Sequence, residues 1–185
     1  MEMRRSARIM QPAPLREVVN LVAFVTSPRS TRESDPLGCS RRLSPSAGAL
    51  HPIDVVLVDW RGTRRVMRYN GLDHRLELLA VQNASPLQDL VTKCSNLLPD
   101  AHGSALILLG SETTVNAAYE RPTSLLWRDA GVLLQTFALA ATAYRLAFCP
   151  LGILGSEIIE AAGLSEQGIQ STGAAIIGRL PKEAR

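Results

Sequence analysis

The chain has 185 residues, of which 46% are hydrophobic and only 4% aromatic, so we expect one domain with an aliphatic core. Its net charge of +3 suits an anionic ligand but does not require nucleic acid, and no nucleic-acid-binding motif is present. Cys39, Cys94 and Cys149 are far apart and odd in number, which argues against a metal site or a disulfide framework and favours reduced thiols in the cytoplasm.

The first 39 residues predict an arm, a helix and a loop. Residues 1–14 are interrupted by prolines and charges, so they predict a flexible or partner-wrapped arm ahead of a single domain over residues 15–185. Apolar residues recur at helical spacing from Leu15 to Val25, and Thr26–Cys39 has the Ser, Pro and Arg content of a loop. The basic start is not followed by a signal-peptide core, and the most apolar stretch, Ala130–Ala143, is too short for a membrane span.

The segment from Arg41 to Pro52 reads Arg-Arg-Leu-Ser-Pro-Ser-Ala-Gly-Ala-Leu-His-Pro. Its guanidinium and hydroxyl groups, which suit a phosphate, belong to Arg41, Arg42, Ser44 and Ser46. Pro45 biases the residue before it toward an extended backbone, and Gly48 lets a ligand approach closely. The segment therefore predicts either a phosphate-binding loop or, on composition alone, an ordinary surface turn.

The rest of the chain alternates strands and helices. The predicted strands are Ile53–Asp59 and Arg65–Tyr69, which form a hairpin around a turn at Trp60–Thr63, then Ala105–Leu109 and Gly173–Ile177. The predicted helices are one capped by Ser85 and running through Leu97, a long one over Thr123–Leu146 capped by Thr123 or Ser124, and a short one over Ser156–Ala162. Loops or turns are expected at Ser111–Arg121 and Phe148–Gly152.

Four segments in matching order resemble the nitroreductase superfamily, nearest to its branch of SagB-type dehydrogenases and azoline oxidases. The Arg41–Pro52 segment is similar to the family's flavin-binding loop. The others are the Asp129-Ala-Gly-x-x-x-Gln135 pattern in the long helix, the Cys149-Pro-Leu-Gly152 loop, and the closing Gly178-Arg179 pair. The resemblance covers about Leu15 to Arg185.

This resemblance implies an α+β, nitroreductase-like fold with a central, mostly antiparallel sheet flanked by helices. It also implies an FMN cofactor, bound at sites that a two-fold homodimer completes. The implied cofactor-binding residues are Arg41, Arg42, Ser44, Pro45, Ser46, Gly48, Gln135, Pro150, Leu151, Gly152 and Arg179. For Arg179 a salt bridge at a strand end is an equal alternative, and Gln135 also suits an ordinary helix position.

The chain departs from its azoline-oxidising relatives where they carry a Lys-Tyr pair that handles protons. Tyr119 is present and is the candidate catalytic residue, but Ala118 stands where Lys is expected, and Val132 replaces a frequent His. From the resemblance as a whole we expect an FMN-dependent oxidoreductase that acts on a peptide or small organic substrate, with NAD(P)H as an electron donor. The alternative is a catalytically silent partner or scaffold subunit with the same fold.

Overall fold

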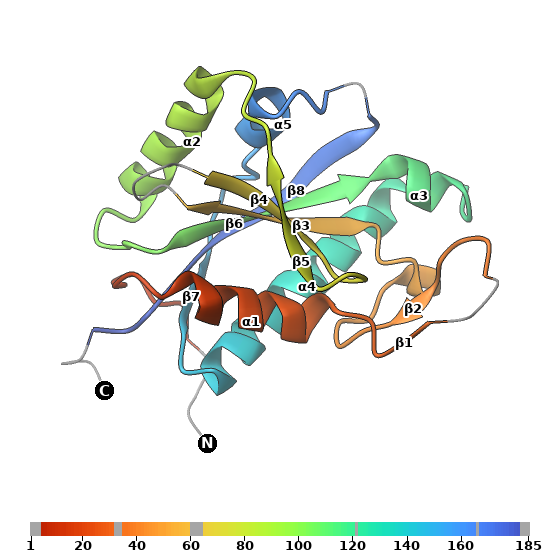
Figure 1. The fold of residues 1–185 in the computed structure, drawn as a ribbon, viewed down its shortest axis with the longest axis horizontal. Coiled ribbons are helices and arrows are strands. Elements are labelled where there is room, and N and C mark those ends of the chain that lie inside the picture. Colours follow the sequence, from red (N-terminus) through yellow and green to blue (C-terminus); the bar gives the residue numbers. More distant parts are fainter. Residues whose placement is uncertain (1–4, 32–34, 60–64, 121, 166, 182–185) are drawn as a thin grey trace.

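The computed structural model describes residues 5–31, 35–59, 65–120, 122–165 and 167–181. It confirms the α+β class, because helices cover both faces of a six-stranded sheet in which every neighbouring pair is antiparallel. The strand order is β5-β4-β3-β6-β8-β7 (Figure 1). These strands are β3 (Ile53–Asp59), β4 (Arg65–Asn70), β5 (Arg75–Leu79), β6 (Ser104–Ser111), β7 (Ala147–Pro150) and β8 (Ile169–Gly178).

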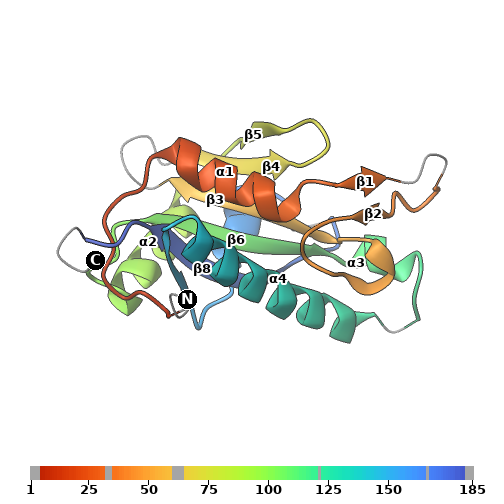
Figure 2. The ribbon, with the colours of Figure 1, turned by 90° about the horizontal axis from the view of Figure 1, so that it is seen from below.

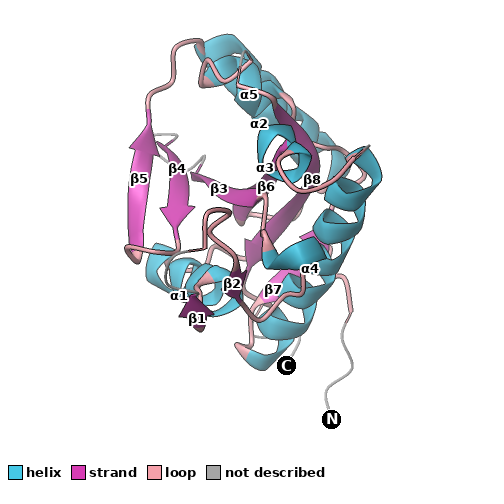
Figure 3. Cartoon of the chain, turned by 90° about the vertical axis from the view of Figure 1, so that its right-hand side faces the viewer, coloured by secondary structure: helices cyan, strands magenta, loops and turns pink. Residues whose placement is uncertain are grey.

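The helices form two layers, one on each face of the sheet (Figures 2 and 3). One layer holds α1 (Leu15–Thr26) and α4 (Thr123–Ala143), and the other holds α2 (Ala84–Leu97) and α5 (Glu157–Ala161). Leu106 of β6 faces the first layer and Ile107 the second, so consecutive side chains of one strand feed two separate hydrophobic cores. This double burial explains why β6 reads as an unbroken apolar run.

Most predicted elements are confirmed, and the strand Ile53–Asp59 has the predicted bounds. The predicted strands at Ala105 and Gly173 both extend further, to Ser104–Ser111 and Ile169–Gly178. The turn predicted at Trp60–Thr63 lies outside the described residues.

Several local predictions are wrong. The loop expected at Ser111–Arg121 contains a short helix, α3 (Glu112–Asn116), and the turn expected at Phe148–Gly152 begins with the edge strand β7. The strand β5 was not predicted. None of its five residues is buried, and the sequence Arg-Leu-Glu-Leu-Leu has neither a continuous apolar run nor a strict alternation of apolar and polar residues. Two small strands, β1 (Ser30–Thr31) and β2 (Ser40–Arg41), pair with each other beside the main sheet.

The predicted helix caps are also wrong. Asn83, not Ser85, caps α2, since its side chain accepts a hydrogen bond from the amide of Ser85. The cap position of α4 is Pro122, without a side-chain hydrogen bond, and the helix ends at Ala143, three residues earlier than predicted. Capping residues cluster at both helix starts, and sequence alone does not decide which one is used.

The described part of the N-terminal arm lies against the rest of the chain. Met10 pairs with Ala101 and Gln11 with Arg179 through isolated β-bridges, and the amide of Ala7 donates to the carbonyl of Phe148 at 3.1 Å. Met10 is only 1% exposed and belongs to the core beneath α2 and α5. Residues 5–14 are therefore held against the sheet and its core by backbone pairing and by burial of Met10. No helix in the described part of the chain is long and apolar enough to cross a membrane.

Candidate functional site

The loop between Arg42 and Pro52 has a strained backbone that leads directly into β3. A single 3-10 turn spans Ala47–Ala49, and Gly48, Ala49 and His51 all have positive φ angles, of 60°, 58° and 49°. Left-handed backbone is unfavourable for residues other than glycine and is often retained at functional sites. The carbonyl of Pro52 accepts a hydrogen bond from the amide of Ser111 at 2.8 Å, which fastens the loop to the end of β6.

Asp129 of α4 clamps this loop. Its carboxylate accepts a 2.5 Å hydrogen bond from the hydroxyl of Ser46 and a 3.3 Å hydrogen bond from the amide of Ala47. The hydroxyl of Ser46 also accepts from the amide of His51 at 3.0 Å. The hydrogen bonds of Asp129 thus go to a segment more than 80 residues earlier in the chain. The carboxylate already occupies the anion position that the sequence offered to a phosphate at Ser46.

Tyr119 lies over the same loop. Its phenol oxygen is 2.8 Å from the position that a Cβ atom would occupy on Gly48, so a side chain larger than hydrogen would meet the ring. Tyr119 is 37% exposed, and the neighbouring Ala118 is exposed as well. The candidate catalytic residue and the predicted flavin loop, about 70 positions apart in sequence, thus form one exposed surface.

Arg42 lies on the other side of the loop, facing inward. Its Nε donates to the hydroxyl of Ser40 at 3.1 Å, and its half-buried side chain lines a cavity of about 240 Å³ and a smaller one of about 20 Å³. Neither cavity is lined by Gly48 or Tyr119. Burial lowers the pKa of Arg42, although Asp54 opposes the effect.

His51 joins the two sides of the loop. Its Nε2 lies 2.8 Å from the carbonyl oxygen of Ser40, which can only accept, so Nε2 carries a proton. Burial, followed by the nearby charge of Arg42, lowers the pKa of His51. The imidazole is therefore neutral at pH 7, with Nδ1 as an acceptor. The sequence motif gave no role to His51, although its place between Leu50 and Pro52 in the motif was the available signal.

The remaining predicted residues are dispersed. Ser44 is buried and makes one long contact, of 3.4 Å, with the carbonyl of Pro45, which is itself exposed. Arg41 is exposed on β2, and Gln135 is exposed on α4. Leu151 donates its amide to Ala174, just beyond the edge strand β7.

Pro150 and Gly152, also exposed, flank Leu151 at the edge strand β7, which β8 and β6 separate from β3, the strand that the loop enters.

Arg179 is far from the loop. It pairs with Glu17 through its Nε, at 2.9 Å, and its terminal nitrogen. It follows the end of β8 that lies beside Ser104, whereas the loop meets the Ser111 end of β6. Because β6 has eight residues, these two ends are about 25 Å apart. One copy of the chain therefore does not bring Arg179 to the loop.

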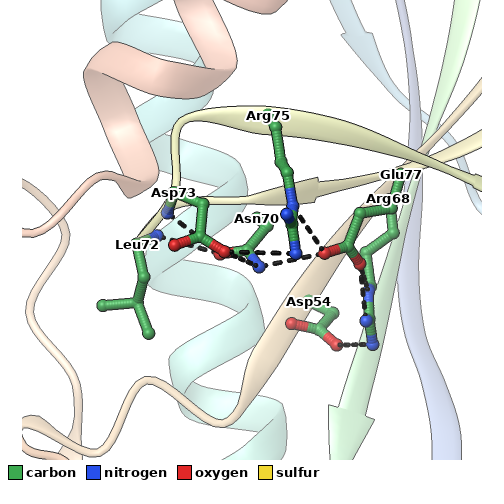
Figure 4. Close-up of polar contacts among 7 residues, drawn as sticks. All are labelled: Asp54, Arg68, Asn70, Leu72, Asp73, Arg75 and Glu77. Atoms are coloured by element: carbon green, nitrogen blue, oxygen red, sulfur yellow. Dashed lines mark hydrogen bonds and ion pairs between the residues drawn. The ribbon is translucent and has the colours of Figure 1, made fainter.

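A network of charged side chains covers the turn between β4 and β5 (Figure 4). Arg68 donates two hydrogen bonds to Glu77, at 3.1 and 2.7 Å, and forms an ion pair of 3.5 Å with Asp54. Asn70 and Arg75 also donate to Glu77. These hydrogen bonds and the ion pairs lower the pKa of Glu77 to about 2, with Asn70 and Arg68 contributing most.

The same turn is joined to α1 by a polar cluster. Nδ1 of His74 lies 3.1 Å from the phenol oxygen of Tyr69 and 3.3 Å from the hydroxyl of Ser27, and these two oxygens are 3.0 Å apart. His74 has a positive φ of 52°. The cluster fixes the turn against the end of α1, next to the larger cavity that Tyr69 helps to line.

The Nitroreductase family model matches residues 1–179 of the chain. No curated protein matches it in sequence. Solved structures do match in fold, and among them is a chain of the E. coli microcin synthetase McbBCD complex with truncated pro-MccB17 bound. The match has a TM-score of 0.70 and 21% identity and covers 98% of this chain and 71% of that chain.

Two further matches have lower identity. A protein assigned as a nitroreductase from Ralstonia eutropha has a TM-score of 0.69 and 18% identity, over 97% of this chain and 80% of that one. A protein assigned as an NADH oxidase from Clostridium acetobutylicum has a TM-score of 0.57 and 15% identity, over 97% and 86%. At these identities the structural matches establish the fold.

Proposed function

The chain belongs to the nitroreductase family, and we propose that it is an FMN-dependent oxidoreductase of the SagB-like branch. The observation that carries the proposal is the loop over residues 44–51, which has three left-handed residues, is clamped by Asp129 and is overlaid by Tyr119. Such strain, fixed by contacts from another element, is typical of ligand sites. When bound, FMN would accept electrons from a donor and pass them to an acceptor.

The chain's residues suit a flavin ring held between two copies. Pro45 and Gly48 are exposed on the loop, and Gly152 has open space around the position that a Cβ atom would take. In one chain the strands β6 and β8 separate these two surfaces, so we propose that the loop of one copy faces Pro150–Gly152 of the other. The two cavities that Arg42 lines, of about 240 and 20 Å³, are each smaller than the roughly 300–1,000 Å³ of typical ligand pockets.

An exposed stripe on α4 supports this homodimer. Trp127 and Leu139, 41% and 55% exposed, lie on the row of α4 that recurs every four residues and also holds Gly131, which has open space above it. Val132, 39% exposed, borders this row near Leu139. An exposed apolar stripe on a long core helix is typical of an interface. Gln135 lies on the same stripe, where it would meet the shared crevice. Light scattering should give twice the chain mass, and Leu139→Arg should give monomers that lose flavin.

For the flavin phosphate we assign Arg41, because it is exposed beside the loop, has no side-chain partner among the described residues and can form a bidentate contact. The guanidinium of Arg42 lies behind the loop, and Arg179 is paired with Glu17 at the opposite end of the sheet, so neither enters this assignment. Tyr119 is the group placed to hold or move a proton at its phenol oxygen, beside Gly48.

The test is the visible spectrum of the protein as purified, with the released cofactor identified by chromatography. We expect a flavin spectrum and FMN in a ratio of one per chain, or uptake of FMN on reconstitution. Arg41→Gln should weaken FMN retention, whereas Arg75→Gln, an exposed arginine on β5, should not. A colourless protein that takes up no FMN contradicts the proposal.

A peptide is the substrate class that we favour. The support is the similarity to a chain of the McbBCD complex, which has truncated pro-MccB17 bound, together with the SagB-like loop. NAD(P)H is the proposed electron donor, by similarity to a protein assigned as an NADH oxidase. Flavin reduction by NADH or NADPH, followed by anaerobic reoxidation with candidate peptides, tests both assignments.

The second candidate function is a catalytically silent partner subunit. It is favoured by the exposed Ala118 where azoline oxidases carry a Lys, and by the ion pair that holds Lys93 to Glu157 between α2 and α5, away from the loop. A flavin that NAD(P)H reduces, with turnover lost in Tyr119→Phe, favours the enzyme. Bound flavin without turnover, in a chain that copurifies with other subunits, favours the silent partner.

A further inference from the structure

A cavity of about 240 Å³ opens inside the sheet, where β3 and β4 separate. The two strands pair from Asp59 and Arg65 as far as Val56 and Arg68, and no pairing continues beyond that point. On their other sides both strands remain paired, β3 with β6 from Ile53 and β4 with β5 through Asn70. The cavity is therefore lined by two backbone edges that face each other without forming a ladder.

The cavity contains a guanidinium with unpaired donors. Nε of Arg42 donates to Ser40, but its two terminal nitrogens have no hydrogen-bond or ion-pair partner among the described residues. A half-buried cation without an acid in contact is costly, and a planar carboxylate matches the guanidinium through two parallel hydrogen bonds. The second arginine in the wall, Arg68, is different because Glu77 and Asp54 already hold it.

Acceptors stand on the opposite wall. Asp54 contacts Arg68 through one oxygen at 3.5 Å, which leaves its other oxygen available, and its side chain is about half exposed. Arg42 and Asp54 line the same cavity. Burial lowers the pKa of Arg42 and the charge of Asp54 opposes this shift, yet no ion pair joins the two residues in the described part of the chain. The gap between them suits a ligand that carries an acceptor and a donor on neighbouring atoms. The neutral His51 offers a further acceptor at Nδ1.

We propose that this cavity binds an α-amino carboxylate unit, with its carboxylate on Arg42 and its N–H group directed to Asp54. The unit is either a free amino acid or the last residue of a peptide, and both present the same chemistry. The walls also hold Ile53, Val55 and Leu72, which favour a small aliphatic side chain. The separated strand edges can hydrogen-bond the peptide backbone, as strand-addition sites do. The volume admits about one residue, and this site needs no flavin.

The test measures binding by calorimetry to the purified protein with five probes. These are L-valine, N-acetyl-L-valine, L-valinamide, the tripeptide Ala-Ala-Val and its C-terminal amide. We expect the probes with a free carboxylate to bind and the two amides to fail. Tighter binding of valine identifies a free amino acid as the ligand, and tighter binding of the tripeptide acid identifies a peptide end.

Two substitutions locate the site. Arg42→Gln should weaken binding of the acids about tenfold or more, as expected for loss of a charge-assisted pair. Arg16→Gln, an exposed arginine on α1 outside the cavity, should leave binding unchanged. Asp54→Asn should weaken L-valine more than N-acetyl-L-valine, which has no ammonium group.

A second measurement does not depend on the variants folding. In the unaltered protein labelled with ¹⁵N, the bound acid should shift the amide signals of Val55, Asn70 and Gly71 and spare those of α2. The proposal is overturned if no probe binds at millimolar concentration, if the amides bind as well as the acids, or if inorganic phosphate displaces valine as effectively as N-acetyl-L-valine does. Shifts confined to residues outside the cavity lead to the same conclusion.

Discussion

The two ends of the central strands are closed in different ways. At the arm end, where β6 begins and β8 ends, the N-terminal segment adds backbone bridges and buries Met10. At the loop end, where β3 begins and β6 ends, the closure depends on side chains, with Asp129 on Ser46 and Tyr119 over Gly48. The arm end uses regular pairing and apolar burial, and the loop end uses polar contacts around a strained backbone.

The two ends of the sheet therefore contribute differently, the arm end to the stability of the fold and the loop end to ligand binding as well. Backbone pairing and hydrophobic burial leave few polar groups available to a ligand, because most buried polar groups already have a partner. The loop end leaves Arg41, Arg42 and Tyr119 partly exposed with donors to offer. Substitutions at the arm end should therefore change unfolding free energy alone, and substitutions at the loop end should change ligand binding as well.

The largest expected effect is at the arm end. Met10→Ala removes a side chain that is 1% exposed and should destabilise the fold by about 2–5 kcal/mol. Chemical denaturation measures this loss, and the FMN bound per folded chain should not change. Ile9→Ala is the matched control, because Ile9 is 59% exposed and its removal should cost less than about 0.5 kcal/mol. Equal losses in the two variants would show that the arm is not docked.

The next effect is at the loop end. Asp129→Ala leaves the hydroxyl of Ser46 and the amide of Ala47 without their acceptor, so it should cost about 1.5–3 kcal/mol. In contrast to Met10→Ala, it should also lower FMN retention, because the loop loses its fixed conformation. Asp129→Asn keeps one acceptor oxygen and should lie between the two. Full FMN retention in Asp129→Ala contradicts the clamp.

A smaller effect separates strain from steric contact in the loop. Gly48→Ala places a Cβ at a φ of 60°, which costs about 1–2 kcal/mol, and brings that atom to 2.8 Å from the phenol oxygen of Tyr119. The double variant with Tyr119→Phe should recover the steric part only. A double-mutant cycle in denaturant measures the coupling. A coupling of zero would mean that Tyr119 does not lie over Gly48.

At the arm end the strands could be predicted from the sequence, but the docking of the N-terminal segment on them could not. The strands Ala105–Leu109 and Gly173–Ile177 were predictable from continuous apolar runs, because both of their faces are buried. The docking of Met10 was not predictable, because one methionine among prolines and charges has no periodicity. Long-range backbone bridges such as Gln11 with Arg179 leave no local pattern.

At the loop end the residues were predictable and their partners were not. The Arg41–Pro52 segment was identified by its order and spacing, but its contact with Asp129 joins residues 83 positions apart. The same holds for the cavity, since the end of pairing at Val56 and Arg68 depends on how the strands diverge in space. Sequence identifies groups capable of chemistry, and the fold decides which of them are already satisfied by each other.

The smallest expected effect concerns the charge network that borders the cavity at the loop end. Glu77 has its pKa lowered from 4.5 to about 2 in the folded chain. A carboxylate with a lowered pKa in the folded state stabilises the fold above its unfolded pKa, and that contribution is lost as the pH falls through the folded value.

The difference in unfolding free energy between the unaltered chain and Glu77→Gln should therefore be constant above about pH 5.5 and fall progressively from about pH 4.5 to pH 2. Denaturation curves across this range measure it, and added salt should reduce it, because exposed charges are screened. If this difference in unfolding free energy instead grows as the pH falls, the stabilising charge belongs to another residue of the network and not to Glu77.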